Sequence, residues 1–312
     1  MRVRLTQLDG ALPNLALMRL ASYHLAQRDE IYVTRRIERD LFELPYDRVY
    51  GSTIFSSSRG RLERFRQEWP HAIVGGTGSG SDVTVEHYIG PHPGVDYTGY
   101  DDFDASIGFS QRGCRLRCRF WVVPTKEGKN RSVATMMEVW RGEPWPKKVH
   151  LLDNDFFGQP EIQWRARIKE IQTLELRVCL SQGINVRLIT RETAEALASI
   201  EYRDTKFSRR RLYTAWDNLG DENVFFRGID ILEQAGIPPQ HVMAYMLVGY
   251  DRSETWERIW HRFNRMVDRG IRPYPMVYDR ARKDLCAFQR WVNLGLYRII
   301  PWDHYRGKRT CE

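Results

Sequence analysis

The sequence predicts an α/β fold built from two domains, in which parallel strands alternate with helices. Two observations predict it. Short apolar runs of strand length alternate with longer amphipathic runs along most of the chain, and the strand-like runs after residue 105 end in polar residues. We therefore expect a small α/β domain over residues 1–104, a (β/α) barrel over residues 105–280 and a C-terminal helical extension over residues 281–312.

The first domain begins with a strand-like run at residues 1–8. Asn14 is a good N-cap for the helix that follows, because its side chain can accept hydrogen bonds from free backbone N–H groups. That helix has one apolar face, formed by Leu17, Met18, Ala21 and Leu25. Short apolar strands are expected at residues 31–33, 49–55 and 72–74. This alternation predicts a small Rossmann-like domain with a parallel sheet.

A glycine-rich run at residues 75–80 follows the last of these strands. Glycine lets a backbone approach a phosphate closely, and a helix N-terminus would favour its charge. The β-branched residues 83–85 come next instead of a clear helix, so a plain loop is favoured over a phosphate site. Pro91, Pro93, Gly94 and the acidic residues 101–104 predict a linker between the domains.

The second domain contains longer alternating elements. Strands are expected near Gly108 and at residues 149–152, 176–180, 212–216, 242–248 and 271–277. Helices are expected between them at residues 191–200, 222–235 and 254–269. Each apolar strand ends in polar residues, and in parallel barrels the loops that follow the strands converge on one rim. That rim is where we expect a ligand.

Bulk properties narrow the class of protein. The chain carries a net charge of +8 and has a pI of about 9.3, which suits an anionic partner such as nucleic acid. A basic solvated surface is the favoured alternative, because the longest arginine block is residues 209–211. The five cysteines are odd in number and irregularly spaced, against a disulfide framework. A signal peptide or long apolar span is lacking, so we expect a cytoplasmic protein without a membrane partner.

Cys114 and Cys118 carry most of the functional information. They lie four residues apart, behind Gly113 and ahead of the aromatic Phe120. Thiolates are the soft ligands that iron–sulfur clusters take, and such ligands often stand on short loops. A third cysteine three positions later would complete a CxxxCxxC loop, and Trp121 stands there.

Residues 106–128 resemble the cluster loop of the radical S-adenosylmethionine superfamily. The lead-in Ser-Ile-Gly-Phe-Ser-Gln-Arg-Gly-Cys at residues 106–114 is similar to the strand that enters this loop. The exit Val-Pro-Thr-Lys-Glu-Gly at residues 123–128 looks like that of one bacterial and phage branch. The resemblance implies a partial (β/α)6 TIM-type barrel, preceded by a domain of cobalamin-binding-like shape. The cobalt-ligating Asp-x-His-x-x-Gly motif is absent from the sequence, so we expect no cobalamin.

The resemblance also implies a function. Cysteines of this loop hold a [4Fe-4S] cluster in the superfamily, and the cluster's open iron binds S-adenosylmethionine. An electron from a donor such as flavodoxin or ferredoxin then cleaves the sulfonium to give a 5′-deoxyadenosyl radical, which acts on a substrate that the sequence does not identify. The implied iron ligands are Cys114 and Cys118. The implied S-adenosylmethionine contacts are Phe120, Asp153, Asn154, Asp155, Arg187, Leu247 and Gly249.

The resemblance implies a role for each of these residues. Phe120 fills the aromatic position before the third cysteine, and the acidic run at residues 153–155 would accept hydrogen bonds from the amino group. Arg187 would clamp a carboxylate of the substrate. Leu247 and Gly249 occupy the strand that packs against adenine in the superfamily.

Alternatives remain for several residues. Asp153 would equally serve as a helix cap, and Arg187 would equally form an ion pair with Asp217. Cys179 is most simply a buried hydrophobic residue, although it is also a candidate third iron ligand. Leu247 would be a core residue outside the family context.

Trp121 leaves three interpretations open, because an indole offers no lone pair to a metal. The protein is an enzyme with a recruited third ligand, or a degenerate barrel that binds S-adenosylmethionine or nucleic acid without redox chemistry. Alternatively, the tryptophan is a single-base change in an otherwise working lineage.

Overall fold

The computed structural model describes residues 1–312 except 82, 91, 93, 117, 306 and 308–312. The chain divides into two compact units, Met1–Asp104 and Ala105–Glu312, which are called unit 1 and unit 2 below. Each unit has hydrophobic clusters of its own, so each is described by itself.

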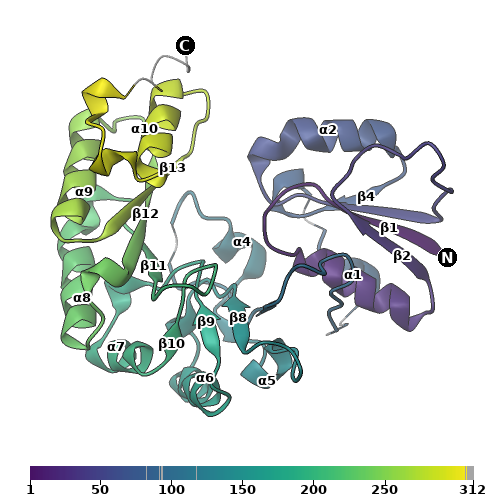
Figure 1. Cartoon of the computed structure of the whole chain (residues 1–312), viewed down its shortest axis with the longest axis horizontal. Helices are drawn as coiled ribbons and strands as arrows, with labels where there is room; N and C mark the ends of the chain where they lie inside the picture. Colours follow the sequence, from purple (N-terminus) through teal and green to yellow (C-terminus); the bar gives the residue numbers. More distant parts are fainter. Residues whose placement is uncertain (82, 91, 93, 117, 306, 308–312) are drawn as a thin grey trace. The chain divides into compact units, whose positions relative to one another are not determined.

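Unit 1 is a parallel four-stranded sheet in the order β2-β1-β3-β4. Its strands are β1 (Arg2–Gln7), β2 (Glu30–Thr34), β3 (Arg48–Ser52) and β4 (Ile73–Gly75). Helices α1 (Leu15–Ala26) and α2 (Arg59–Glu68) cover opposite faces of the sheet (Figure 1). The predicted strands and the first predicted helix are confirmed.

Helix α1 begins as the sequence predicts. The side chain of Asn14 accepts hydrogen bonds from the first backbone N–H groups of the helix at 3.1 and 3.2 Å. The prediction that Leu25 lies on the buried face is wrong, because this side chain is 39% exposed. His24 is buried in the last turn instead, where its ring contacts Asp29 at 2.7 Å and Tyr50 at 3.3 Å.

The connection from β2 to β3, residues 35–47, is a loop wrapped around a buried arginine. Arg4 in strand β1 is 1% exposed and forms an ion pair with Glu43 of the loop. Its guanidinium also lies over the rings of Tyr46 and Trp69, at 5.7 and 4.7 Å. The loop presents three apolar side chains to solvent, Leu41, Phe42 and Leu44.

The glycine-rich run after β4 forms a short 3-10 turn, Thr77–Ser79, with left-handed φ values at Gly76 and Gly80. The next helix, α3 (Glu86–Ile89), has four residues and begins seven residues after the turn. Within the described residues, the turn does not run into a helix of its own, and the N–H of Gly78 donates to the carbonyl of Thr53 at 3.0 Å. The run is a loop, as the plain-loop interpretation predicts.

The predicted linker is partly wrong, because its second half packs onto unit 1. Tyr100 is buried, and its hydroxyl donates a hydrogen bond to Gln7 Oε1 at 2.8 Å. Tyr97 and Phe103 stack with ring centroids 6.5 Å apart. Pro91 and Pro93 lie outside the described residues.

Unit 2 contains two parallel sheets, with strand orders β10-β9-β8-β5 and β11-β12-β13. The first sheet has β5 (Ser106–Gly108), β8 (Lys148–Leu151), β9 (Arg177–Cys179) and β10 (Glu201–Tyr202). The second sheet has β11 (Leu212–Ala215), β12 (Val242–Val248) and β13 (Arg272–Val277). An antiparallel pair, β6 (Gln111–Arg112) and β7 (Arg131–Ser132), lies beside the cysteine loop in the sequence. All six predicted strands are confirmed, and the two-residue strand β10 is an addition.

The long helices of unit 2 lie along the outer side of its strands (Figure 1). They are α6 (Glu161–Thr173), α7 (Arg191–Ala198), α8 (Glu222–Gln234), α9 (Trp256–Asp268) and α10 (Lys283–Asn293). Two short helices, α4 (Val123–Glu127) and α5 (Met136–Val139), precede them. The three predicted helices match α7, α8 and α9, whereas α6 is an addition.

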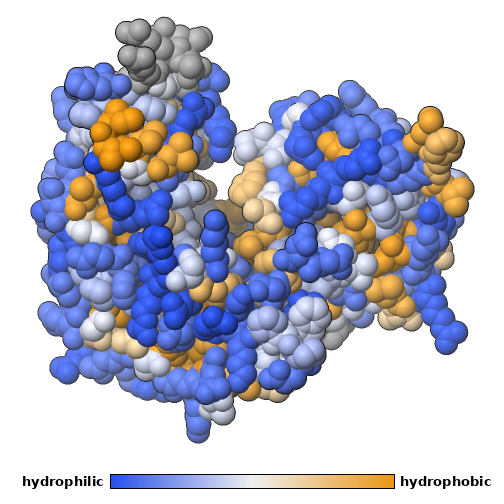
Figure 2. All heavy atoms as spheres, in the orientation of Figure 1, coloured by the Kyte–Doolittle hydropathy of each residue, from blue (hydrophilic) through white to orange (hydrophobic). Residues whose placement is uncertain are grey.

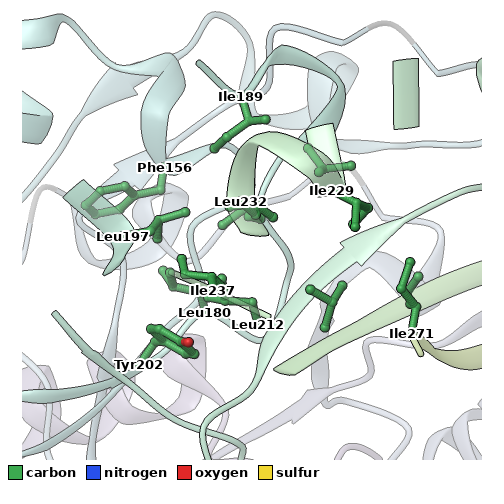
Figure 3. Close-up of a cluster of buried hydrophobic side chains, with 14 of the residues drawn as sticks. Phe156, Leu180, Ile189, Leu197, Tyr202, Leu212, Ile229, Leu232, Ile237 and Ile271 are labelled. Atoms are coloured by element: carbon green, nitrogen blue, oxygen red, sulfur yellow. The ribbon is translucent and has the colours of Figure 1, made fainter. Parts of the chain in front are cut away.

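The main core of unit 2 lies between the strands and these helices. Figure 3 shows Leu180, Leu212, Ile229 and Leu232 among the side chains that fill it. Strand β12 alternates between buried and half-buried residues, so every second side chain enters this core. Leu247 belongs to the other, half-buried set, so its side chain lies on the face of the sheet opposite this core.

The surface of unit 2 is mainly hydrophilic in the view of Figure 2, with a hydrophobic patch beside α10 and the segment after it. Leu294 and Ile299 are 68% and 76% exposed there. Among the helices that the structure describes, none has both the length and the apolar character that a membrane crossing requires.

Candidate functional site

The cysteine loop follows the first strand of unit 2 and lies between β6 and α4. Both thiols, Cys114 and Cys118, are half-buried and unbridged. Gly113 enters the loop with φ of +85°, and a Cβ there would lie 2.5 Å from the carbonyl oxygen of Lys129. Only glycine fits this close approach, so the Gly-Cys pair of the sequence has a steric reason.

Asp155 holds the first turn of this loop. Its carboxylate is 1% exposed and accepts hydrogen bonds from the backbone N–H of Arg115 at 3.1 Å and from its guanidinium at 2.8 and 3.0 Å. The amide of Asn130 donates to the same carboxylate at 3.1 Å. The residue after Cys114 is therefore fixed to the loop that follows strand β8.

Asp153 holds the lead-in to the loop. Its carboxylate accepts hydrogen bonds from the backbone N–H of Ser110 at 2.7 Å, from that of Gln111 at 3.1 Å, and from the Ser110 hydroxyl. Burial raises the pKa of Asp153 to about 7, and these hydrogen bonds oppose the rise. The carboxylate caps neither the short helix that follows nor α6, so the helix-cap alternative is wrong.

Asn154 lies between these two carboxylates in the sequence, and its amide donates to Glu127 at 3.2 Å. Glu127 also accepts hydrogen bonds from Arg112 and from the backbone N–H of Gly113, both at 3.1 Å. It therefore ties the exit helix α4 to both the start of the cysteine loop and the end of β8. Glu127 is part of the exit motif at residues 123–128, but nothing in that motif predicts these contacts.

The thiol of Cys114 lies in a setting that disfavours ionisation. Burial raises its pKa, the nearby Asp155 and Cys118 raise it further, and Arg115 opposes them. Cys179 in strand β9 is fully buried, and desolvation raises its pKa to about 12. Within the described residues, no group of three His, Cys, Asp or Glu side chains is placed to hold a metal ion. The burial of Cys179 in strand β9 agrees with the simpler of its two interpretations, a buried hydrophobic residue.

Arg187 lies between the cysteine loop and the start of α8. One guanidinium nitrogen binds Asp221 at 2.6 Å, and another lies 3.9 Å from the sulfur of Cys118. The predicted partner Asp217 is wrong, because the short turn at residues 219–221 brings the later carboxylate to the guanidinium. Arg187 therefore couples the second cysteine to the rim of the second sheet.

Leu247 and Gly249 are fixed at the end of strand β12. The backbone N–H of Leu247 donates to Asp217 at 2.8 Å, and its carbonyl accepts from the buried Arg262 at 2.9 Å. Glu254, the ion-pair partner of Arg262, accepts the N–H of Gly249 at 3.0 Å. Burial raises the pKa of the Asp217 carboxyl. This network sets the shape of the end of strand β12.

Phe120 brings the cysteine loop against the same strand end. Its ring meets that of Tyr250, the residue after Gly249, edge-on with centroids 5.3 Å apart. Trp121 follows with its backbone N–H bonded to the carbonyl of Cys118 at 3.0 Å, and its side chain is 37% exposed. The cysteine loop, Arg187 and the end of β12 therefore form one assembly at the carboxyl ends of the strands.

Three comparisons with known proteins were negative. No protein-family model matches the chain, and neither the curated proteins nor the solved structures gave a significant match. The functional conclusion below therefore depends on the residues and their geometry.

Proposed function

We propose that the protein is a cytoplasmic radical S-adenosylmethionine protein, in which Cys114 and Cys118 bind an iron–sulfur cluster beside a bound S-adenosylmethionine. The observation that carries this proposal is the cysteine loop after the first strand, held by carboxylates from the end of the next strand. Ligands of parallel α/β folds bind at this edge of the strands.

The two parallel sheets support a partial (β/α)6 TIM-type barrel as the finer architecture. The hydroxyl of Tyr245 in β12 donates to the carbonyl of Ser181 after β9, at 2.6 Å. The N–H of Ile184 donates to the carbonyl of Tyr213 in β11, at 2.7 Å. These bonds join the ends of the two sheets, which is the continuity a curved barrel wall requires.

The contacts divide the predicted S-adenosylmethionine residues into two groups. Asp153 and Asp155 are occupied by the cysteine loop, and we propose that they position it. Asn154, Leu247 and Gly249 belong to the same rim, and we propose that the atoms they keep outside their own hydrogen bonds contact the ligand, with Phe120 packing against the end of β12. The guanidinium of Arg187 lies near Cys118, and we propose that it binds a carboxylate of the ligand there while it keeps its ion pair with Asp221.

The described residues fit a cubane cluster in part. Two thiolates stand on one loop, but a [4Fe-4S] cluster of this type takes three protein ligands, and the described residues bring no third donor to them. A bound cluster would supply the electron for cleavage of the sulfonium. Its third ligand must then come from elsewhere.

Trp121 favours a second candidate function, a barrel that binds S-adenosylmethionine without redox chemistry. Its indole stands at the third ligand position and is partly exposed. An indole N–H is a donor only and does not bind iron. This candidate keeps the rim contacts and removes the cluster.

Anaerobic reconstitution with iron and sulfide separates the two candidates. We expect the natural protein to take up iron, and the Cys114→Ser and Cys118→Ser variants to lose it. Trp121→Cys is expected to reach about four irons per chain. Trp145→Cys, which places a cysteine at another exposed tryptophan, is the control and should behave as the natural protein.

Two results decide the matter. Iron uptake by Trp121→Cys alone would refute the cluster proposal for the natural chain and leave the second candidate. Calorimetry with S-adenosylmethionine tests what both candidates share. The ligand should bind the natural protein and bind Gly249→Ala more weakly, because Gly249 has φ of +77° and a Cβ would lie 2.7 Å from Leu285.

A further inference from the structure

Two neighbouring strands of unit 2 end in the same three residues. Tyr250-Asp251-Arg252 follows β12, and Tyr278-Asp279-Arg280 follows β13. The strands are parallel and paired up to Val248 and Val277, and the N–H of Tyr278 donates to the carbonyl of Val248 at 3.0 Å. The two triplets therefore lie side by side on the rim that carries the cysteine loop.

The tyrosines extend the aromatic contact of the cysteine loop into a row of three rings. Phe120 meets Tyr250 with centroids 5.3 Å apart, and Tyr250 meets Tyr278 with centroids 4.9 Å apart, both edge-on. Tyr278 is 59% exposed at the outer end of the row. A large exposed ring fixed by its neighbour is a ready stacking surface, because little side-chain freedom is lost when a ligand covers it.

The aspartates of the two triplets are used within their own turns. Asp251 accepts hydrogen bonds from the N–H and the hydroxyl of Ser253, both at 2.8 Å. Asp279 accepts the N–H of Ala281 at 2.9 Å. These bonds engage both carboxylates within their own turns and not with the arginine of the triplet.

Exposed cations stand close in sequence to the three rings. Arg252 and Arg280 are exposed, and in the part of the chain that the structure describes neither forms an ion pair. The same holds for Arg119, beside Phe120, and for Lys283. The other charged groups of these turns pair with one another, Arg282 with Asp284 and Arg262 with Glu254, so these four cations and the two turn carboxylates leave a positive excess in a chain of net charge +8.

We propose that this rim, the aromatic–arginine rim, binds single-stranded nucleic acid, with a base stacked on Tyr278 and phosphates on Arg252 and Arg280. The exposed ring and the cations offer partners for both the bases and the phosphates of an unpaired nucleic acid. A duplex fits less well, because its base faces are stacked inside the helix and cannot reach Tyr278. A neutral peptide fits less well, because it carries no negative charge for the arginines to bind. Binding of nucleic acid at this rim is independent of the proposed function. The inference rests on the proposed function only where it makes the bound nucleic acid the substrate beside the cysteine loop.

The test measures binding of a fluorescent oligouridylate of about 12 nucleotides to the full chain by anisotropy, at about 50 and 200 mM salt. Replacing both rim arginines, Arg252→Ala with Arg280→Ala, should weaken binding about 10-fold or more at the lower salt. It should also reduce the slope of log K against log salt by about 1.4, since each phosphate contact contributes about 0.7. Arg48→Ala with Arg59→Ala removes the same charge from exposed positions in unit 1 and should change binding less than about 2-fold.

Stacking is tested apart from charge. Tyr278→Ala should weaken binding roughly 5-fold or more, whereas Tyr278→Phe should bind as the natural protein does, because a base stacks on the ring and not on the hydroxyl. Thermal unfolding of each variant checks that the rim remains folded.

The outcomes that overturn the proposal are specific. They are no binding by the natural protein at the lower salt, equal loss in the two double variants, or equal binding of a duplex, polyglutamate or a tyrosine-rich peptide. The assay needs neither iron nor S-adenosylmethionine. A protein that binds the oligonucleotide but takes up no iron therefore refutes the cluster proposal alone, and the reverse result refutes only this one.

Discussion

Asp153 shows how one buried carboxyl makes stability depend on pH. It is 1% exposed, and its described hydrogen bonds come from neutral donors. Burial raises its pKa from 3.8 to about 7. Between these two values the folded chain holds a proton that the unfolded chain has released, so stability falls as pH rises across this window and levels off above it.

Asp153→Asn is expected to remove this pH dependence. An asparagine amide can accept the two backbone N–H bonds through its oxygen and donate to the Ser110 hydroxyl, so it copies the protonated acid. Urea unfolding between pH 4 and 8 should show the natural protein losing roughly 4 kcal/mol relative to the variant, the equivalent of a shift of about 3 pKa units. Parallel pH profiles of the two proteins would contradict this account.

Gly113 and Gly128 both have positive φ and stand on either side of the segment that holds the cysteine loop and α4. Their φ values are +85° and +75°, but a Cβ at Gly113 would lie 2.5 Å from Lys129, whereas nothing lies within 4 Å at Gly128. Each change to alanine strains a backbone that has positive φ, and Gly128, with ψ of −148°, lies in a region that other residues rarely adopt. Only Gly113→Ala should also displace the loop, and we expect faster alkylation of Cys114 by iodoacetamide in that variant. Equal rates in the two variants would rule out the close-approach explanation.

At the scale of elements, the connection from β2 to β3 in unit 1 is a loop instead of a helix, and it contacts the buried Arg4. Residues 35–47 cross from β2 to β3 as a loop, and Arg4 binds Glu43 and the carbonyl of Arg36, the latter at 2.8 Å. Ile37 and Tyr46 of the loop pack into the hydrophobic cluster that contains Trp69, and the ion pair adds a buried polar contact at Glu43. The exposed Leu41 and Phe42 at its tip are presented on a fixed base.

Glu43→Gln should therefore destabilise unit 1 by about 3 kcal/mol, because it leaves the charge of Arg4 buried without its partner. Hydrogen exchange over residues 35–47 should rise in the same variant. Glu63→Gln, in the exposed pair of α2 with Arg59, is the control and should cost less than about 0.5 kcal/mol. The expectation fails if both variants have the same stability.

At the scale of the whole molecule, each hydrophobic cluster of the described residues draws its members from one unit. The main cluster draws all of its buried residues from unit 2, and the two smaller clusters draw theirs from unit 1. A segment with its own core can fold by itself. Residues 105–312 expressed alone should unfold cooperatively in calorimetry, and a broad transition without an enthalpy peak would show that unit 1 is needed.

Local pattern was sufficient for most elements of this fold. Alternating apolar residues predicted the strands of both units, and Asn14 marked the start of α1, because these signals depend on a few neighbouring residues. The same logic placed Leu25 in the core and missed β10, since neither burial at a helix end nor a two-residue strand has a local signature.

The sequence by itself determined the α/β class, the strand order along the chain and the cysteine loop with its glycine, since each follows from spacing or from the geometry of one residue. Only the tertiary structure decided the partners of the charged groups. Asp153 and Asp155 hold the cysteine loop, Arg187 binds Asp221 instead of Asp217, and two Tyr-Asp-Arg triplets meet at neighbouring strand ends. These contacts join residues far apart in the chain, and their geometry depends on how strands and loops pack together.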